Sequence, residues 1–586
     1  MSTLKVFMPG KGEVRLQPTD HLASGGEGAV YLKNGTVFKV FLHPERARAN
    51  GMAEKIALLS KLKHPFIVAP TDILLNDAHE LVGYTMPEAA GIPLVKTFTN
   101  AWRDQNSFAD KEAGQLVNHM RTAVQAAHDM RAVVADGNEM NYLVHGVEPR
   151  LIDVDSWQIG PHPATALMPS IQDFHRQGFD DLSDWFSWGI VTFQVFTGIH
   201  PYKGTHPAFK KGDLEARMRA NASVFDAQVK LNAAVRDFRC IPPPLLAWYE
   251  GVFSKGERVA PPDFLHSQAP KALTKRLRTV QQGSGVIKHE RLRSLPGTIR
   301  HVSANGVAFY TAGTGLAAYD LVRNQGLPSL TPAQIAALFD NQAGLIRFGN
   351  GFVYLKNSAG TISGQLVFGE RDPVPVQTTT NVLPCIADKL AVIGNKVYAL
   401  STKAINGMVE LALSAIGSRV VLTTKAAWPV NVKATRFYDG FAVMDCLGAP
   451  FVVMPEGDSV HILRAPALAD YKVVNGFGRS IHRLWVHGIR RSDGQTCRIE
   501  LRANGREFEV LHTELVDVAE MNVAVSPNGI GVAIFEEGAV SVCNTQGDSV
   551  QEVKDASVTP DMRLYGLPDG IFYYLGSDIF RLSFGK

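Results

Sequence analysis

Residues 134–144 read Val-Ala-Asp-Gly-Asn-Glu-Met-Asn-Tyr-Leu-Val, and residues 151–153 follow with Leu-Ile-Asp. Asp136 and Asn141 stand five positions apart, just before an apolar run that predicts a strand, and Asp153 ends the next apolar run. Phosphoryl transfer from ATP requires an Asp near the acceptor hydroxyl and an Asn/Asp pair that binds Mg²⁺. The pattern predicts such a site; the alternative is a turn with Asx caps.

A glycine-rich turn lies upstream of these acids. Residues 22–31 read Leu-Ala-Ser-Gly-Gly-Glu-Gly-Ala-Val-Tyr between two predicted strands, where backbone amides can approach phosphate oxygens. Lys39 stands in the middle of the apolar run 37–40. Because a buried lysine needs an anionic partner, we expect Glu54, in a predicted helix at 53–62, and a nucleotide phosphate to supply it.

The order of these motifs resembles the protein kinases, in their bacterial eukaryotic-like branch. The resemblance covers residues 1–268 and implies a bilobal α+β kinase-like domain, with an N-lobe at 1–90 and a C-lobe at 91–268. It implies ATP and Mg²⁺ as cofactors, Asp136, Lys39 and Glu54 as catalytic residues, and Asn141 and Asp153 as metal ligands. Asp184 would hold the loop of Asp136. The nucleotide-binding residues that it implies are Ala23, Gly25, Gly26, Gly28, Val30, Val37, Lys39, Met86, Glu88 and Leu143.

The sequence departs from the kinase pattern at several positions. Ala23 replaces the first glycine of the loop, and Val-Ala-Asp at 134–136 lacks the usual Arg. Asp153-Val154-Asp155 stands in place of Asp-Phe-Gly, as in bacterial stress-associated kinase-like proteins. In the family, an arginine at the position of Arg258 pairs with a Glu, but the matching segment here, Met168-Pro169-Ser170, lacks that Glu. We therefore expect Arg258 to bind another partner.

The second half of the chain carries an internal repeat. A turn with glycine followed by an apolar strand recurs at Gly306, Gly351, Gly394, Gly440, Gly529 and Gly570, at intervals of about 44 residues with one double interval. A unit of this length suits a four-stranded antiparallel sheet, and radial stacking of such sheets buries their faces. We therefore expect an all-β propeller at 291–586, with seven blades favoured and six or eight possible. A β-sandwich or a pair of barrels is the alternative.

Two strands and a connector complete the expected organisation. The strand near residues 286–293 is expected to pair with the last unit, 571–584, and so close the ring. Residues 269–290 form a basic linker with Lys271, Lys275, Arg276 and Arg278, which we interpret as a solvated connector and not a nucleic-acid site.

Composition narrows the classes of protein. Of 586 residues, 45% are hydrophobic and 20% charged, which excludes wholesale disorder. The net charge of +3 gives no general attraction to nucleic acid or membrane. Five cysteines without a CxxC pair exclude a disulfide scaffold and favour a reduced setting. No signal peptide or membrane-spanning run is visible, so we expect a cytoplasmic protein.

These observations predict an ATP- and Mg²⁺-dependent protein kinase that phosphorylates Ser or Thr of a protein recruited by the propeller. The alternatives are a nucleotide-binding pseudokinase scaffold and a small-molecule phosphotransferase of the aminoglycoside-kinase type. By resemblance, a von Willebrand-type domain protein and a phosphatase are possible partners; nucleic acid and membrane are not expected as partners.

Overall fold

The computed structural model describes residues 3–264 and 287–584, with short gaps at 329, 340–342, 350, 359–360, 368–373, 379–384, 403–405, 417–418, 527 and 546–549. We call residues 3–264 the N-terminal half and residues 287–584 the C-terminal half. Most of the predicted linker at 269–290 lies outside the described residues.

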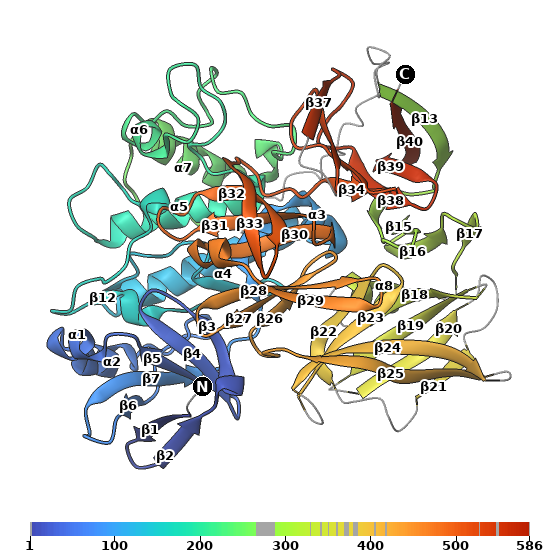
Figure 1. Cartoon of the computed structure of the whole chain (residues 1–586). Coiled ribbons are helices and arrows are strands. Elements are labelled where there is room, and N and C mark those ends of the chain that lie inside the picture. Colours follow the sequence, from blue (N-terminus) through green and yellow to red (C-terminus); the bar gives the residue numbers. More distant parts are fainter. Residues whose placement is uncertain are drawn as a thin grey trace.

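The N-terminal half begins with a seven-stranded sheet in the order β2-β1-β6-β7-β5-β4-β3 (Figure 1). Its strand pairs are antiparallel, and β5 lies between β4 and β7. Its strands are β1 (Leu4–Met8), β2 (Gly12–Leu16), β3 (His21–Ser24), β4 (Gly28–Lys33), β5 (Thr36–Phe41), β6 (Ile73–Leu75) and β7 (Leu81–Pro87). Buried Val37, Phe38 and Phe41 make β5 apolar enough to lie inside the sheet.

Helices form the core of the rest of this half. The helical spacing of Leu116, Met120, Val124 and Ala127 predicts a helix over 113–130, and the structure has it as α4, in which these four residues are at most 2% exposed. Residues 185–197 of α5 are all buried. The helices are α1 (Pro44–Ala49), α2 (Met52–Leu59), α3 (Asn100–Gln105), α4 (Asp110–Asp129), α5 (Asp181–Thr197), α6 (Leu214–Arg219), α7 (Pro243–Ser254) and, in the C-terminal half, α8 (Pro332–Phe339).

Short 3₁₀ turns and two small sheets connect these helices. The small sheets are β11-β10-β8 and β12-β9, formed by β8 (Ile92–Pro93), β9 (Ala132–Val133), β10 (Tyr142–His145), β11 (Glu148–Leu151) and β12 (Gln158–Ile159). The 3₁₀ turns are η1 (Pro18–Asp20), η2 (Leu94–Phe98), η3 (Val154–Ser156), η4 (Pro169–Ile171), η5 (Phe238–Cys240) and, in the C-terminal half, η6 (Pro466–Asp470).

Antiparallel sheets fill the C-terminal half. Three are four-stranded: β13-β40-β39-β38, β14-β15-β16-β17 and β34-β35-β36-β37. Their strands are β13 (Ile287–Ser294), β14 (Ile299–Val302), β15 (Val307–Ala312), β16 (Gly315–Asp320), β17 (Gln325–Gly326), β34 (Val523–Val525), β35 (Ile530–Ala533), β36 (Ala539–Asn544), β37 (Val550–Lys554), β38 (Arg563–Leu567), β39 (Gly570–Leu575) and β40 (Asp578–Phe584). The predicted pairing of the strand near 286–293 with the last unit is confirmed, because Ile287 pairs with Phe584.

Two further sheets have eight strands each, because parallel pairs join neighbouring four-stranded units: β21 with β25, and β29 with β33. The first contains β18 (Ala343–Phe348), β19 (Gly351–Ser358), β20 (Thr361–Val367), β21 (Val374–Thr378), β22 (Cys385–Ile393), β23 (Lys396–Ser401), β24 (Gly407–Ile416) and β25 (Arg419–Pro429). The second contains β26 (Thr435–Phe437), β27 (Ala442–Cys446), β28 (Ala449–Glu456), β29 (Ser459–Arg464), β30 (Tyr471–Ser480), β31 (Arg483–Arg490), β32 (Thr496–Asn504) and β33 (Glu507–Leu515).

The predicted fold class is wrong. The described chain is mostly β, with 43% strand and 20% helix, and its sheets include two half-barrels; it is not a bilobal α+β kinase domain followed by a propeller. The kinase-like motifs describe a few residues around one site, and such a site does not determine the arrangement of the helices and sheets around it. The parallel joins merge units that the 44-residue period suggested were separate sheets.

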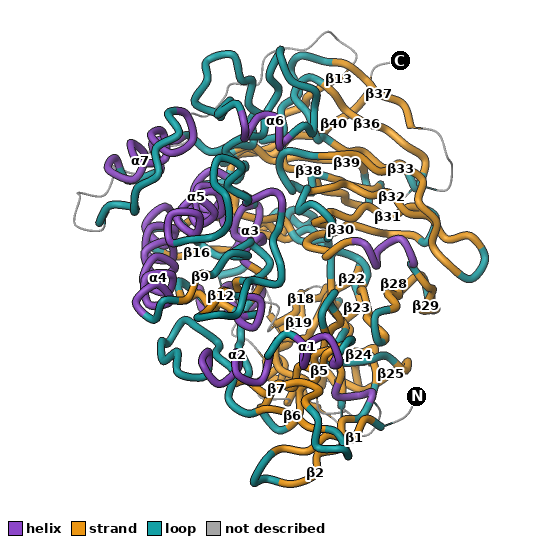
Figure 2. The backbone as a smooth tube through the Cα atoms, turned by 90° about the vertical axis from the view of Figure 1, so that its left-hand side faces the viewer, coloured by secondary structure: helices purple, strands orange, loops and turns teal. Residues whose placement is uncertain are grey.

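The two halves pack against each other. Val474 and Ile489, from β30 and β31, belong to the same hydrophobic cluster as the buried residues of α4 and α5. Figure 1 shows these strands in front of the two helices, and Figure 2 gives the view turned by 90°. Across the described ranges, no helix is both long enough and apolar enough to span a bilayer.

Candidate functional site

Lys39 lies on β5, an interior strand of the N-terminal sheet, and is 4% exposed. Its Nζ donates to both carboxylate oxygens of Asp155, at 2.8 and 2.9 Å, and also to Asp153. Burial alone would lower the pKa of Lys39, but the charges of Asp155 and Asp153 raise it well above its usual value. The two acids therefore favour the charged form of this buried ammonium.

Asp155 is the acid that the sequence analysis missed. It is 1% exposed and also accepts a hydrogen bond from Tyr84 Oη at 2.6 Å. The sequence signal was the second carboxylate of Asp153-Val154-Asp155, two positions after the acid that was assigned to the metal.

The structure does not bring Glu54 to Lys39. Glu54 is exposed on α2, and within the described chain the ion pairs of Lys39 go to Glu27, Asp153 and Asp155. The buried side chain at this point of α2 is Lys55, whose Nζ donates to Pro163 O at 3.0 Å. Burial lowers the pKa of Lys55 to about 8.

The glycine-rich turn connects β3 to β4 beside Lys39. Ala23 pairs with Val30 across the hairpin, and Gly25 N donates to Gly28 O at 2.9 Å. A Cβ on Gly28 would lie 2.8 Å from Val40 O, so this position requires glycine, whereas a Cβ on Gly26 would meet nothing within 4 Å. The turn thus keeps an open backbone at Gly26 and a close backbone contact at Gly28.

Glu27, between these glycines, points toward Lys39, with Oε2 4.0 Å from Nζ. Burial raises the pKa of Glu27. Three carboxylates therefore surround one lysine, and the site carries an excess of negative charge.

Apolar residues expected around a nucleotide base gather only in part. Val37 pairs with Met86, and both lie in one hydrophobic cluster with the half-buried Val30. Leu143 lies in the separate small sheet, paired with Pro93, and Glu88 is exposed just after β7.

Asp136 lies on a loop that Asp184 anchors, as expected. The carboxylate of Asp184 accepts hydrogen bonds from Val134 N at 2.7 Å, Ala135 N at 2.8 Å and His128 Nε2 at 2.9 Å. Ala135 has φ 57°, a left-handed conformation that these bonds stabilise. The anchor fixes where the loop presents Asp136.

Asp136 itself is 7% exposed. It accepts hydrogen bonds from Asn138 Nδ2 at 2.9 Å, Asn141 Nδ2 at 3.3 Å and Met168 N at 2.9 Å. Burial raises its pKa above the usual value of 3.8. A carboxylate of raised pKa is suited to act as a general base.

Asn141 and Asp153 lie close together, because Ile152 N donates to Asn141 O at 2.9 Å. Asp153 has φ 62°, and its side chain is 34% exposed. Among the described residues there is no group of three or more His, Cys, Asp or Glu that could hold a metal. A Mg²⁺ of the kind that is bound by one or two protein groups plus substrate phosphates fits this donor set, whereas an all-protein metal cage does not.

Arg258, for which we expected a partner other than the missing Glu, pairs with Asp173. Its guanidinium forms a two-pronged ion pair with Asp173, at 2.6 and 2.8 Å, and stacks over Phe186. This buried pair ties the end of α7 to the segment before α5.

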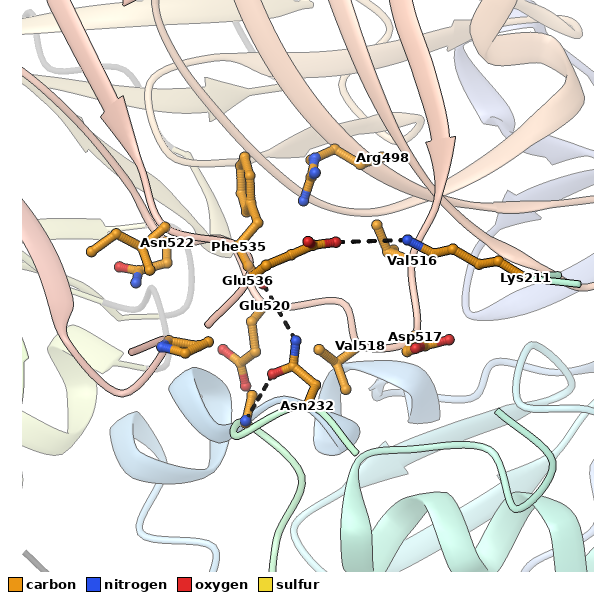
Figure 3. A pocket seen from close by; sticks show the side chains of 13 residues that line it. Lys211, Asn232, Arg498, Val516, Asp517, Val518, Glu520, Asn522, Phe535 and Glu536 are labelled. Carbon is orange, nitrogen blue, oxygen red and sulfur yellow. Dashed lines mark hydrogen bonds and ion pairs between the residues drawn. The ribbon is translucent and has the colours of Figure 1, made fainter. Parts of the chain in front are cut away.

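A cavity lies away from these residues, between the two halves (Figure 3). Lys211 and Asn232 line it from the N-terminal half, and Arg498, Glu520 and Glu536 are among its residues from the C-terminal half. Lys211 Nζ and Glu536 Oε1 approach to 3.7 Å across it. None of the predicted site residues lines this cavity.

Comparison with known proteins gives no relative, since no protein family matches the chain and no curated protein matches it significantly. The function must therefore be argued from the site itself.

Proposed function

We propose that the protein is an ATP- and Mg²⁺-dependent protein kinase, which transfers the γ-phosphoryl group to Ser or Thr hydroxyls of a protein substrate. One observation carries the proposal. The buried ammonium of Lys39 is held by Asp153 and Asp155, while Ile152 links this acid pair to the loop of Asp136 and Asn141. An ammonium, an Asp/Asn pair and a separate buried Asp are the groups that phosphoryl transfer needs.

Each residue then has a chemical task. Lys39 binds phosphate oxygens, and Asp155 keeps its ammonium in place. Asp136 accepts the proton of the acceptor hydroxyl, for which its raised pKa is suited. Asn141 and Asp153 would hold Mg²⁺, which neutralises charge on the phosphates.

The open turn at Gly26 would let backbone amides approach the phosphates. Val30, Val37 and Met86 offer an apolar surface to the adenine.

The proposal includes a cellular location and protein partners. Cys240, Cys446, Cys497 and Cys543 are free thiols, which supports a reducing, cytoplasmic location. The C-terminal half would serve as an interaction platform for the protein substrate. A von Willebrand-type domain protein and a phosphatase are the partners suggested by the resemblance.

The experiment is to incubate the purified full chain with Mg²⁺ and γ-labelled ATP, and to compare it with Asp136→Ala and Lys39→Ala. We expect label on the protein or on a copurified partner, lost in both variants. Asp129→Ala and Lys11→Ala, which change exposed residues, are the matched controls and should keep the wild-type rate.

A second candidate, a nucleotide-binding scaffold, is favoured by one observation: Asp136 is engaged by donors of the chain itself. ATP binding without any transfer of label would support the scaffold and reject the kinase.

A further inference from the structure

The loop that carries Asp136 and Asn141 is held from two sides. From within the loop, Asn138 Oδ1 accepts a hydrogen bond from Met140 N at 2.8 Å. From the C-terminal half, Lys472 of β30 donates its Nζ to Met140 O at 3.2 Å. A lysine 332 residues further along the chain therefore contacts the residue next to Asn141.

The loop carries an excess of negative charge. Residues 136–141 include two acids, Asp136 and Glu139, and no basic residue. Glu139 is 5% exposed, and its Oε2 has no hydrogen-bond partner among the described residues. Lys203 and Lys472, one from each half, are the cations whose charges act on Glu139. The two lysines compensate a buried acid beside Asp136.

Lys472 also lies in the field of the expected metal ligand. Burial, with the nearby charge of Arg491, lowers the pKa of Lys472 to about 8, whereas Glu139 and Asp153 favour its charged form. The charges of both acids thus act on this ammonium, whose hydrogen bond goes to Met140 O.

A second contact from the same sheet reaches the segment that faces Asp136. A Cβ on Gly494, in the turn between β31 and β32, would lie 2.7 Å from Met168 Cγ. Met168 N is the backbone donor to Asp136. Lys472 and Gly494 thus place the C-terminal half against both chain segments around Asp136.

We propose that the C-terminal half completes the phosphoryl-transfer site, and that Lys472 is a positioning residue that holds the 136–141 loop in its working conformation. This inference rests on the proposed function. It gives the C-terminal half a role beyond that of a platform, because the site is incomplete until β30 is docked.

The first measurement is the kinetics of phosphoryl transfer by the full chain with Lys472→Met and Lys472→Arg. We expect the Met variant to lower kcat about tenfold or more, the scale of one charge-assisted hydrogen bond, with KM for ATP changed less than about twofold. The Arg variant should recover most of the rate. The matched control is Lys433→Met, which removes another inter-half lysine, bonded to Leu32 O and Asp20 away from the loop, and should leave kcat unchanged.

The second measurement is amide hydrogen exchange in residues 136–143, which does not depend on activity. We expect faster exchange there in Lys472→Met, and wild-type exchange in Lys433→Met. Unchanged loop exchange, or an unchanged kcat in Lys472→Met, would overturn the inference. If the wild-type chain transfers no phosphoryl group, the proposed function fails, and loop exchange alone decides whether Lys472 positions the loop.

Discussion

Asp155 accepts three hydrogen bonds while almost fully buried, two from Lys39 and one from Tyr84. Asp153, which also pairs with Lys39, keeps a third of its side chain exposed. The two acids therefore have different tasks, although they are only two positions apart. Asp155 secures the lysine, and Asp153 stays available to a cation.

Asp155→Asn is predicted to lower the stability more than Asp153→Asn. Breaking a buried ion pair by removing one partner costs about 3–5 kcal/mol, and a partly exposed carboxylate costs less. Thermal melting of both variants measures the difference. Equal melting temperatures would contradict the division of tasks, as would a larger loss of Mg²⁺-dependent transfer in Asp155→Asn than in Asp153→Asn.

The charged carboxylate of Asp136 is predicted to lower the free energy of unfolding of the protein at neutral pH. Because its folded-state pKa is raised by burial, the native state binds the proton more tightly than the unfolded state, so stability rises as pH falls through the folded-state pKa. Asp136→Asn should therefore melt higher than wild type at pH 7, and the gain should shrink as the pH falls through the folded-state pKa and vanish below the lower unfolded-state pKa. A gain that is independent of pH would refute the assignment of this cost to the charged carboxylate.

At the scale of elements, the hairpin of β3 and β4 places a glycine turn over Lys39. Gly28 lies against the backbone of β5, and Gly26 faces open space. This difference gives a matched pair of substitutions within one turn.

Gly28→Ala is predicted to destabilise the N-terminal sheet by about 1–3 kcal/mol, the usual cost of overpacking, and to weaken ATP binding. Gly26→Ala should melt like the wild type. Thermal melting and ATP affinity of the two variants check this; a Gly26→Ala as damaging as Gly28→Ala would show that space is not what selects glycine at residue 28.

Individual elements could be predicted from the sequence where the spacing of apolar residues or a glycine turn determines the local structure. The spacing of Leu116, Met120, Val124 and Ala127 predicted α4. The glycine turn expected at Gly440 is also present, with a left-handed φ of 98° that favours glycine. Asp184 was correctly expected to hold the loop of Asp136. Glu54 was expected at Lys39 because it lies on a neighbouring helix, but helical phase turns Lys55 inward and leaves Glu54 in solvent.

At the scale of the whole molecule, the sequence could not show how units join. The 44-residue period located the four-stranded units, but the parallel pairs of β21 with β25 and β29 with β33 depend on contacts between distant edges, which no local pattern records. The docking of β30 on the loop of Asp136 is likewise a long-range contact.

A buried acid also holds the halves together. Glu520 accepts a hydrogen bond from Asn100 N and pairs with Arg563 at 3.0 Å. Although burial opposes it, the charge of Arg563 lowers the pKa of Glu520 below 4.5. Such a group stabilises the fold above its unfolded-state pKa, and the stabilisation is lost as pH falls through the folded-state pKa.

Glu520→Gln is therefore predicted to melt lower than wild type at pH 7, with a difference that shrinks as the pH falls below about 4. Exposed Glu215→Gln is the control and should show no difference at either pH. Melting curves over this pH range test the prediction, which fails if the difference stays constant.

The central claim is that Lys39, Asp153 and Asp136 form a phosphoryl-transfer site. The most direct measurement is the rate of γ-phosphoryl transfer at saturating Mg²⁺ and ATP by Asp136→Asn, relative to wild type. The predicted result is a fall of about 10²–10⁴-fold, the usual contribution of a general base, with ATP affinity retained. A transfer rate equal to that of the wild type would contradict the account.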